Sequence, residues 1–170
     1  RQVRRTRGLH RDARRRVPFP TVALVGYTNA GKSTLFNHLT QARVLAKDML
    51  FATLDPTSRR LRFPEEREVI LTDTVGFIRQ LPKDLIHAFR STLEEVQEAD
   101  LLVHVIDSSS PHIETHVEEV EQTIESLGAG STPVIRVLNK IDAVGPDEWV
   151  RLKAEFEGMW DAAYEGRRGC

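Results

Sequence analysis

The chain has 170 residues, of which 40% are hydrophobic and 29% are charged, and 24 Lys and Arg against 25 Asp and Glu leave a net charge of −1. That length suits one compact domain, and the apolar share is too high for a disordered tail. No segment approaches the roughly 18 uncharged apolar residues of a transmembrane helix, and the basic start leads into no long apolar run of a secretory signal. The single cysteine, Cys170, excludes an internal disulfide and a cysteine zinc cluster. We therefore expect a soluble cytoplasmic protein, most simply a monomer.

The charge is unevenly distributed along the chain. Residues 1–20 hold eight arginines and one acid, Asp12, for a net charge of +7, so the other 150 residues carry −8. A basic arm beside an acidic body is typical of proteins that contact an anionic partner, with nucleic acid the leading candidate. A solvated helix end or linker explains the same arginines, and charge alone leaves both interpretations open. Pro18 and Pro20 end the arm, so we expect one domain over residues 21–170.

Short apolar runs alternate with amphipathic stretches along that domain. The runs lack polar alternation, as in strands buried on both faces of a parallel sheet, and cover residues 21–25, 69–72, 101–106 and 134–138. Helical spacing of apolar residues covers 32–39, 85–99, 114–127 and 146–160. The alternation predicts an α/β fold with a doubly wound, mostly parallel sheet. Ligands bind such sheets beyond the carboxyl ends of the strands, where polar residues are the first candidates.

The first run is followed by GYTNAGKS at residues 26–33, which fits G-x-x-x-x-G-K-[ST] at every fixed position. The glycines allow consecutive backbone N–H groups to point at phosphate oxygens at a helix N-terminus. Lys32 would bring positive charge to the β and γ phosphates, and the Ser33 hydroxyl would ligate Mg²⁺. A glycine-rich turn that caps an ordinary helix is the alternative. The strand before the motif and the helix after it favour a nucleotide phosphate site.

The third run ends at Asp107, which matches no motif, whereas the fourth ends in Asn139-Lys-Ile-Asp142, an N-K-x-D pattern. A carboxylate there accepts hydrogen bonds from N1–H and the 2-amino group of guanine, a donor pair that adenine lacks. Asn139 would connect the base site to the phosphate loop, and the Lys140 stem would lie against the ring. The pattern alone is common at strand ends. Behind a phosphate loop it predicts a guanine site and argues against an ATPase.

The second run ends in Asp73-Thr-Val-Gly76, a D-x-x-G pattern 40 residues after the phosphate-loop serine. Asp73 would hold Mg²⁺ through water, and the Gly76 N–H would meet the γ-phosphate. A type I turn explains the same residues on their own. Before this motif lies FATLDPT at residues 51–57, in which either Thr53 or Thr57 could ligate Mg²⁺ and contact the γ-phosphate.

The residue sequences of these motifs resemble those of one protein family. Residues 26–39 read GYTNAGKSTLFNHL, residues 51–57 FATLDPT and residues 73–79 DTVGFIR, followed by Leu81-Pro-Lys. In this order they closely resemble the HflX family of ribosome-associated GTPases over residues 1–145. The resemblance implies a P-loop GTPase domain of the Ras-like type that hydrolyses GTP, binds the large ribosomal subunit and its rRNA, and acts in ribosome splitting, rescue or biogenesis. An RNA-modification-type GTPase shares several motifs, but FATLDPT and DTVGFIR fit it less well.

The resemblance also implies roles for individual residues. Alignment on FATLDPT gives Thr53 as the threonine that ligates Mg²⁺, so the metal ligands are Ser33, Thr53 and Asp73 and the catalytic residues are Lys32, Thr53 and Gly76. Potassium-activated relatives carry an asparagine at the position of Asn29, which makes K⁺ a second candidate ion. The nucleotide site comprises Gly26, Tyr27, Thr28, Asn29, Ala30, Gly31, Lys32, Ser33, Thr34, Phe51, Ala52, Thr53, Leu54, Asp55, Asp73, Thr74, Val75, Gly76, Asn139, Lys140, Ile141 and Asp142.

The chain departs from the family pattern at two places. The family's glycine-rich N-terminal domain and its last guanine motif, a Ser-Ala-type loop, are absent from the sequence, so we expect a G domain over residues 21–170 without the last strand and helix. Residues 1–20 would then be an interdomain helix end or linker. Phe77 stands where Ras-like switches carry a glutamine that orients water, which predicts slow hydrolysis without a partner or cation. The alternative function is a catalytically weak fragment that binds nucleotide or rRNA.

Overall fold

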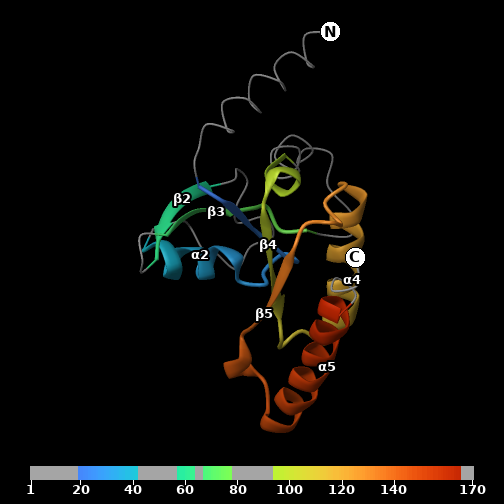
Figure 1. Cartoon of the computed structure of the whole chain (residues 1–170). Coiled ribbons are helices and arrows are strands. Elements are labelled where there is room, and N and C mark those ends of the chain that lie inside the picture. The colour runs from blue at the N-terminus through green and yellow to red at the C-terminus, as the bar shows by residue number, and fades with distance from the viewer. Residues whose placement is uncertain (1–18, 42–56, 64–66, 78–93, 166–170) are drawn as a thin grey trace, which may run out of the picture.

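The computed structural model describes residues 19–41, 57–63, 67–77 and 94–165, with side chains described up to residue 156 in the last range. Its centre is a five-stranded sheet in the order β2-β3-β1-β4-β5 (Figure 1). The strands are β1 Thr21–Val25, β2 Thr57–Arg62, β3 Glu68–Asp73, β4 Leu101–Asp107 and β5 Val134–Asn139. The labelled helices are α2 Lys32–Thr40, α4 Ile113–Ser126 and α5 Pro146–Glu165, with a 3-10 turn, η3, at Ile141–Ala143. Only β2, which is antiparallel to β3, departs from the parallel arrangement, and the predicted fold class is confirmed.

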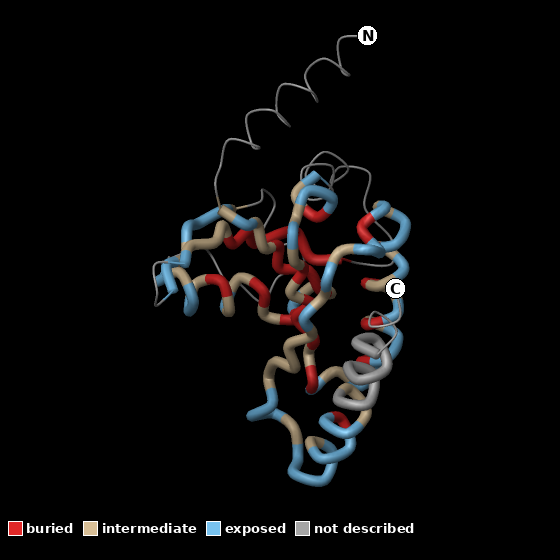
Figure 2. Tube along the Cα trace, viewed as in Figure 1, coloured by how far each residue is buried: buried red, intermediate tan, exposed pale blue. Residues whose placement is uncertain are grey.

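Strand β1 lies at the centre of the sheet and contributes side chains to both of its faces. Leu24 packs with Phe36 of α2 on one face, whereas Ala23 and Val25 pack with Val120 of α4 on the other. Helices α2 and α4 lie on opposite sides of the sheet (Figure 1), and buried residues follow the central strands and the inner sides of the helices (Figure 2). Because both faces are covered, an uninterrupted apolar run is what β1 requires.

Four strands, β1, β3, β4 and β5, match the predicted apolar runs to within one residue at each end. Strand β2 was not predicted, because TSRRLR is polar and carries three arginines. It lies at the edge of the sheet with only Thr57 and Leu61 half-buried, so it needs no apolar face. Of the helix predicted over residues 85–99, the described part is helical at 94–98. The basic arm lies outside the described residues, and none of the described helices has the length and hydropathy of a membrane span.

Candidate nucleotide-binding site

The phosphate-loop motif, residues 26–33, connects β1 to α2 at the carboxyl edge of the sheet. Gly26 has a φ of +152°, and a Cβ there would overlap the carbonyl oxygen of Val105 on β4. Gly31 has a φ of +98°, and a Cβ there would overlap the side-chain nitrogen of Asn139 at the end of β5. Both positions combine a backbone conformation that favours glycine with the close approach of another strand. The loop therefore lies directly against the ends of β4 and β5.

Two backbone hydrogen bonds fasten this loop to the segment after β3. The Phe77 N–H donates to the Gly26 carbonyl and the Thr28 N–H donates to the Phe77 carbonyl, both at 3.0 Å. Gly76 lies so close to the loop that a Cβ on it would be 2.7 Å from the Thr28 Cα. The D-x-x-G motif is thus brought against the phosphate loop. The Phe77 side chain is 2% exposed and packs in the core with Val25, so its ring is a packing group.

Lys32 brings a positive charge into the loop. Its buried Nζ donates to the carbonyl oxygens of Gly26 and Tyr27 at 3.1 and 3.0 Å. Burial lowers the pKa of Lys32 to about 8, a shift that the nearby Asp73 carboxylate partly offsets. Lys32 is also the first residue of α2, whose N-terminal N–H groups carry partial positive charge. A cation and a helix N-terminus at one place favour an anion such as phosphate.

Ser33 and Asp73 bring together the oxygen ligands that Mg²⁺ prefers. The Ser33 hydroxyl donates to Asp73 Oδ2 at 2.7 Å, and Asp73 is fully buried at the end of β3. A hydroxyl beside a carboxylate is a hard-oxygen donor pair, so these two residues fit a magnesium ion. The third predicted ligand, Thr53, lies outside the described residues, as do Phe51, Ala52, Leu54 and Asp55. The other candidate threonine, Thr57, begins β2 and pairs in register with Asp73.

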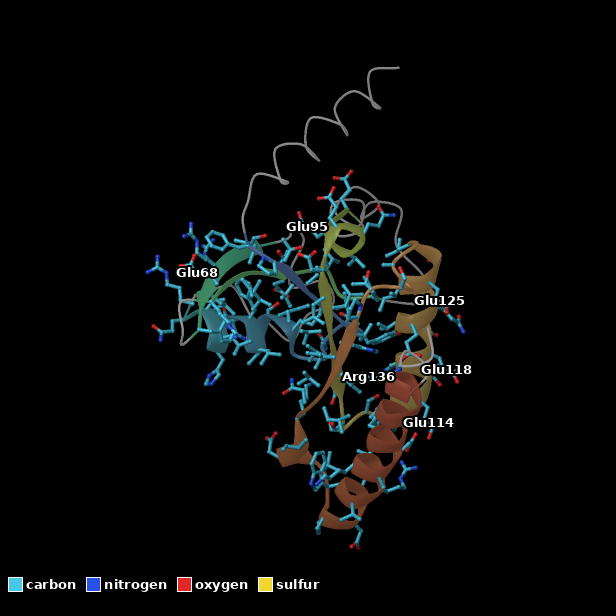
Figure 3. All side chains as sticks on the ribbon, in the orientation of Figure 1. Glu68, Glu95, Glu114, Glu118, Glu125 and Arg136 are labelled. Atoms are coloured by element: carbon cyan, nitrogen blue, oxygen red, sulfur yellow. The ribbon has the colours of Figure 1, made fainter. Side chains whose placement is uncertain are left out.

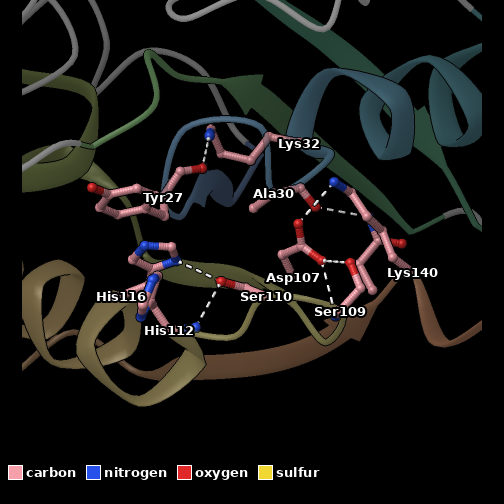
Figure 4. Close-up of polar contacts among 10 residues, drawn as sticks. Tyr27, Ala30, Lys32, Asp107, Ser109, Ser110, His112, His116 and Lys140 are labelled. Atoms are coloured by element: carbon pink, nitrogen blue, oxygen red, sulfur yellow. Dashed lines mark hydrogen bonds and ion pairs between the residues drawn. The ribbon is translucent and has the colours of Figure 1, made fainter. Parts of the chain in front are cut away.

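The N-K-x-D motif joins the end of β5 to the phosphate loop. The Asn139 side-chain N–H donates to the Ala30 carbonyl at 2.8 Å, so the motif contacts the phosphate loop. The Lys140 Nζ donates to Asp107 Oδ2 at 2.8 Å (Figure 4). Asp142 is exposed in η3, and within the described part of the chain its carboxylate makes no hydrogen bond. Its oxygens are therefore open to a ligand with paired N–H donors.

The other predicted site residues divide into exposed and buried groups. Asn29 is exposed with a φ of +60°, and Thr34 and Ile141 are also exposed. Thr74 and Val75 are buried, and the Thr74 hydroxyl donates to the Leu24 carbonyl at 2.5 Å. Thr74 and Val75, both predicted site residues, are therefore covered by the rest of the fold.

Sequence reasoning missed His104, which lies on β4 beneath the loop. The residue is 1% exposed, it lines a cavity of about 40 Å³ together with Thr28 and His116, and its Nδ1 has no hydrogen-bond partner in the described part of the chain. Burial, followed by the positive charges of Arg136 and Lys32, lowers the pKa of His104 to about 3. The sequence did not indicate that His104 is buried, because residues 101–106 predict a strand whether or not the histidine is present.

We expect the neutral His104 to make folding sensitive to acid. Its pKa is lower in the folded chain than the ordinary value of 6.5, so the unfolded chain binds more protons below pH 6.5 and stability is lost as the pH falls towards 3. At pH 5 the loss amounts to roughly 2 kcal/mol. Urea unfolding of the parent and of His104→Leu at pH 7.5 and 5.0 measures it. The variant should lose less stability between the two pH values; an equal loss contradicts the assignment, and the exposed His38→Gln is the control.

Comparison with known proteins shows which family the chain resembles. Residues 21–140 match the family described as 50S ribosome-binding GTPase. GTPase HflX of Caldanaerobacter subterraneus subsp. tengcongensis is 58% identical over 141 residues, and GTPase HflX of Escherichia coli K12 is 51% identical over 141 residues. Each alignment covers 83% of this chain and 33% of the relative, so the chain spans about a third of the length of these relatives.

Solved structures agree on the fold. Era in complex with MgGDPNP and nucleotides 1506–1542 of 16S ribosomal RNA superposes with a TM-score of 0.67 and 28% identity, over 83% of this chain and 47% of that one. The complex of SsGBP and GDP gives a TM-score of 0.62 and 31% identity, over 81% of this chain and 39% of that one. The family match extends over most of the domain and the identities to the HflX proteins exceed half. We conclude that this chain belongs to the family described as 50S ribosome-binding GTPase and, within it, to the HflX GTPases.

Proposed function

We propose that this chain binds GTP and GDP together with Mg²⁺ and hydrolyses GTP to GDP and phosphate. One contact carries the proposal: the Asn139 side-chain N–H donates to the Ala30 carbonyl at 2.8 Å and fixes the N-K-x-D motif beside the phosphate loop. A nucleotide needs its base and its phosphates recognised at one edge of the protein, and this contact joins the two motifs that would do so. The relatives named GTPase HflX support the same activity.

Each group in the site has a distinct role in this proposal. Lys32 and the backbone N–H groups of residues 26–33 would bind the phosphates, and the Gly76 N–H would donate to the γ-phosphate. Ser33, Asp73 and Thr53 would hold Mg²⁺, which when bound neutralises charge on the β and γ phosphates. The exposed Asp142 would accept the guanine N1–H and 2-amino groups.

We propose that the chain further contacts the large ribosomal subunit and its rRNA as a cytoplasmic monomer. Support comes from the description of the matched family as 50S ribosome-binding and from eight arginines within residues 1–20. Arginines that neutralise RNA phosphates bind more weakly as salt rises. Sedimentation with purified large subunits at increasing salt tests this partner separately from the nucleotide site.

Replacing Asp142 should change which base is bound. Asp142→Asn exchanges a double acceptor for an amide, so it should lower the affinity for GDP and raise it for xanthosine diphosphate, which carries a carbonyl where guanine has its amine. We expect the ratio of the two dissociation constants to shift by about 100-fold. Calorimetric titration with both nucleotides measures the shift. Asp147→Asn, an exposed carboxylate in the first turn of α5, is the control, and GDP binding by Asp142→Asn at the parent affinity would contradict the base assignment.

Single-turnover hydrolysis separates an enzyme from a fragment that only binds nucleotide. With the protein in excess over GTP, the parent should release phosphate faster than Lys32→Ala, because the buried Lys32 ammonium would stabilise charge on the β and γ phosphates. Equal rates for the two proteins, with GDP still bound, would favour the binding-only alternative.

We propose that K⁺ supplies positive charge that the protein itself lacks. The Phe77 ring is committed to the core and cannot orient water, whereas Asn29 is exposed on the phosphate loop with a side-chain oxygen that can coordinate a cation. A cation beside the phosphates acts electrostatically as an arginine finger does.

Hydrolysis should accordingly be faster in K⁺ than in Na⁺. At matched ionic strength we expect about a tenfold difference for the parent and a much smaller one for Asn29→Ala, since removing one stabilising group from a transition state costs about tenfold or more. Phosphate release under single-turnover conditions measures both. Equal parent rates in the two salts would remove the potassium proposal and leave the GTPase proposal intact.

A further inference from the structure

We infer that Asp107 is a positioning residue for guanine recognition: its carboxylate holds the Lys140 ammonium so that the lysine stem is fixed where the base binds. The inference rests on the proposed function, because it concerns the same nucleotide site. No sequence motif includes Asp107, which ends β4 on a strand that contributes nothing else to the base motif.

The Asp107 carboxylate is held at both of its oxygens (Figure 4). Oδ1 accepts hydrogen bonds from the Ser109 N–H at 3.0 Å and from the Ser109 hydroxyl at 2.6 Å. Oδ2 accepts from the Lys140 Nζ at 2.8 Å. One oxygen is therefore fixed by the turn that follows β4, and the other is aimed at the lysine of the N-K-x-D motif.

Strand register brings the two residues together. Asp107 pairs with Asn139 in the parallel ladder between β4 and β5, and the Ser108 N–H continues that ladder to the Asn139 carbonyl at 2.9 Å. Lys140 follows with a left-handed backbone, at a φ of +59°, and its carbonyl accepts the Ala143 N–H at 3.0 Å. The lysine backbone is thus fixed from both sides. What remains to be fixed is its long side chain, and Asp107 does that.

Charge and flexibility explain why this contact matters for a ligand. Burial opposes ionisation of Asp107, but the hydrogen bonds from Lys140 and Ser109 outweigh it and hold its pKa below the ordinary value, so the carboxylate is charged at neutral pH. A lysine stem that must lie flat against a base loses rotamer freedom when the ligand binds. A lysine side chain that is already held at its ammonium group loses less rotamer freedom when the ligand binds, so the ligand binds more tightly. The side chains are 37% and 19% exposed for Lys140 and Asp107, so solvent screens the pair and the effect is moderate.

Asp107→Asn separates the ion pair from the turn. An asparagine oxygen can still accept the Ser109 N–H, but it offers the lysine no charge. We expect the dissociation constants for GDP and GTP to rise together by about fivefold, the size typical of a partly exposed charge-assisted contact. Calorimetric titration of the parent and the variant measures both nucleotides.

A double-mutant cycle with Lys140→Met tests whether Asp107 acts through the lysine. Methionine keeps an apolar stem but has no ammonium to hold, so adding Asp107→Asn in that background should change the GDP affinity by less than about twofold. A fivefold loss in both backgrounds, or no loss in the parent background, overturns the inference. Should Asp107→Asn not fold, Asp107→Ser, which also removes the charge that holds Lys140, gives the same cycle.

The matched control is Glu121→Gln. Glu121 of α4 accepts from Arg136 of β5 at 2.6 Å (Figure 3 labels Arg136). The side chains are 24% exposed for Arg136 and 39% for Glu121, so this ion pair is comparable in exposure but joins β5 to a helix. Glu121→Gln should bind GDP with the parent affinity. A fivefold loss of GDP affinity in this variant as well would show that Asp107→Asn acts through overall stability, and it would overturn the inference. A parent that does not bind GDP overturns the proposed function itself. A parent that binds GDP as tightly as Asp107→Asn overturns only the role of Asp107.

Discussion

The phosphate loop can reach the ends of neighbouring strands only because two of its residues have no side chain. Gly26 lies against the Val105 carbonyl of β4, and Gly31 lies against the Asn139 amide at the end of β5. Any Cβ at either place would push the loop away from the sheet edge. The Asn139 contact with the loop and the placement of Lys32, the residue after Gly31, depend on this approach. Backbone shape, more than any charged group, therefore positions the site.

The electrostatics of the site follow from that closeness. Lys32 and Asp73 are both buried beside the loop, and the carboxylate raises the pKa of the lysine against the lowering effect of burial. A second cation beneath them would be repelled, and the Lys32 charge indeed contributes, after burial and Arg136, to keeping His104 neutral. Lys32 can attract a polyanion, and Asp73 can hold a divalent cation beside it, so the two buried charges suit an anion that binds together with a metal ion.

The motifs and the apolar runs predicted most of the arrangement, because parallel strands end at one edge and carry their polar residues there. Strand β2 could not be predicted, since an edge strand such as TSRRLR needs no apolar pattern. The pairing of Asp107 with Lys140 depends on the register of β4 and β5 and on a left-handed lysine backbone, and neither is visible in residue types. The burial of His104 was hidden for a different reason: a histidine inside an apolar run does not reveal which face it occupies.

Phe77 shows how one residue can serve the core and the site through different atoms. Its ring packs among the apolar residues beneath α4, while its N–H and carbonyl bond to Gly26 and Thr28 of the phosphate loop. A displacement of this backbone would have to break two hydrogen bonds to the loop and disturb a fully packed ring at once. The segment after Asp73 is thereby coupled to the core as well as to the phosphate site. A glutamine at this position would place a polar amide in that apolar cluster, so the fold favours an apolar side chain here.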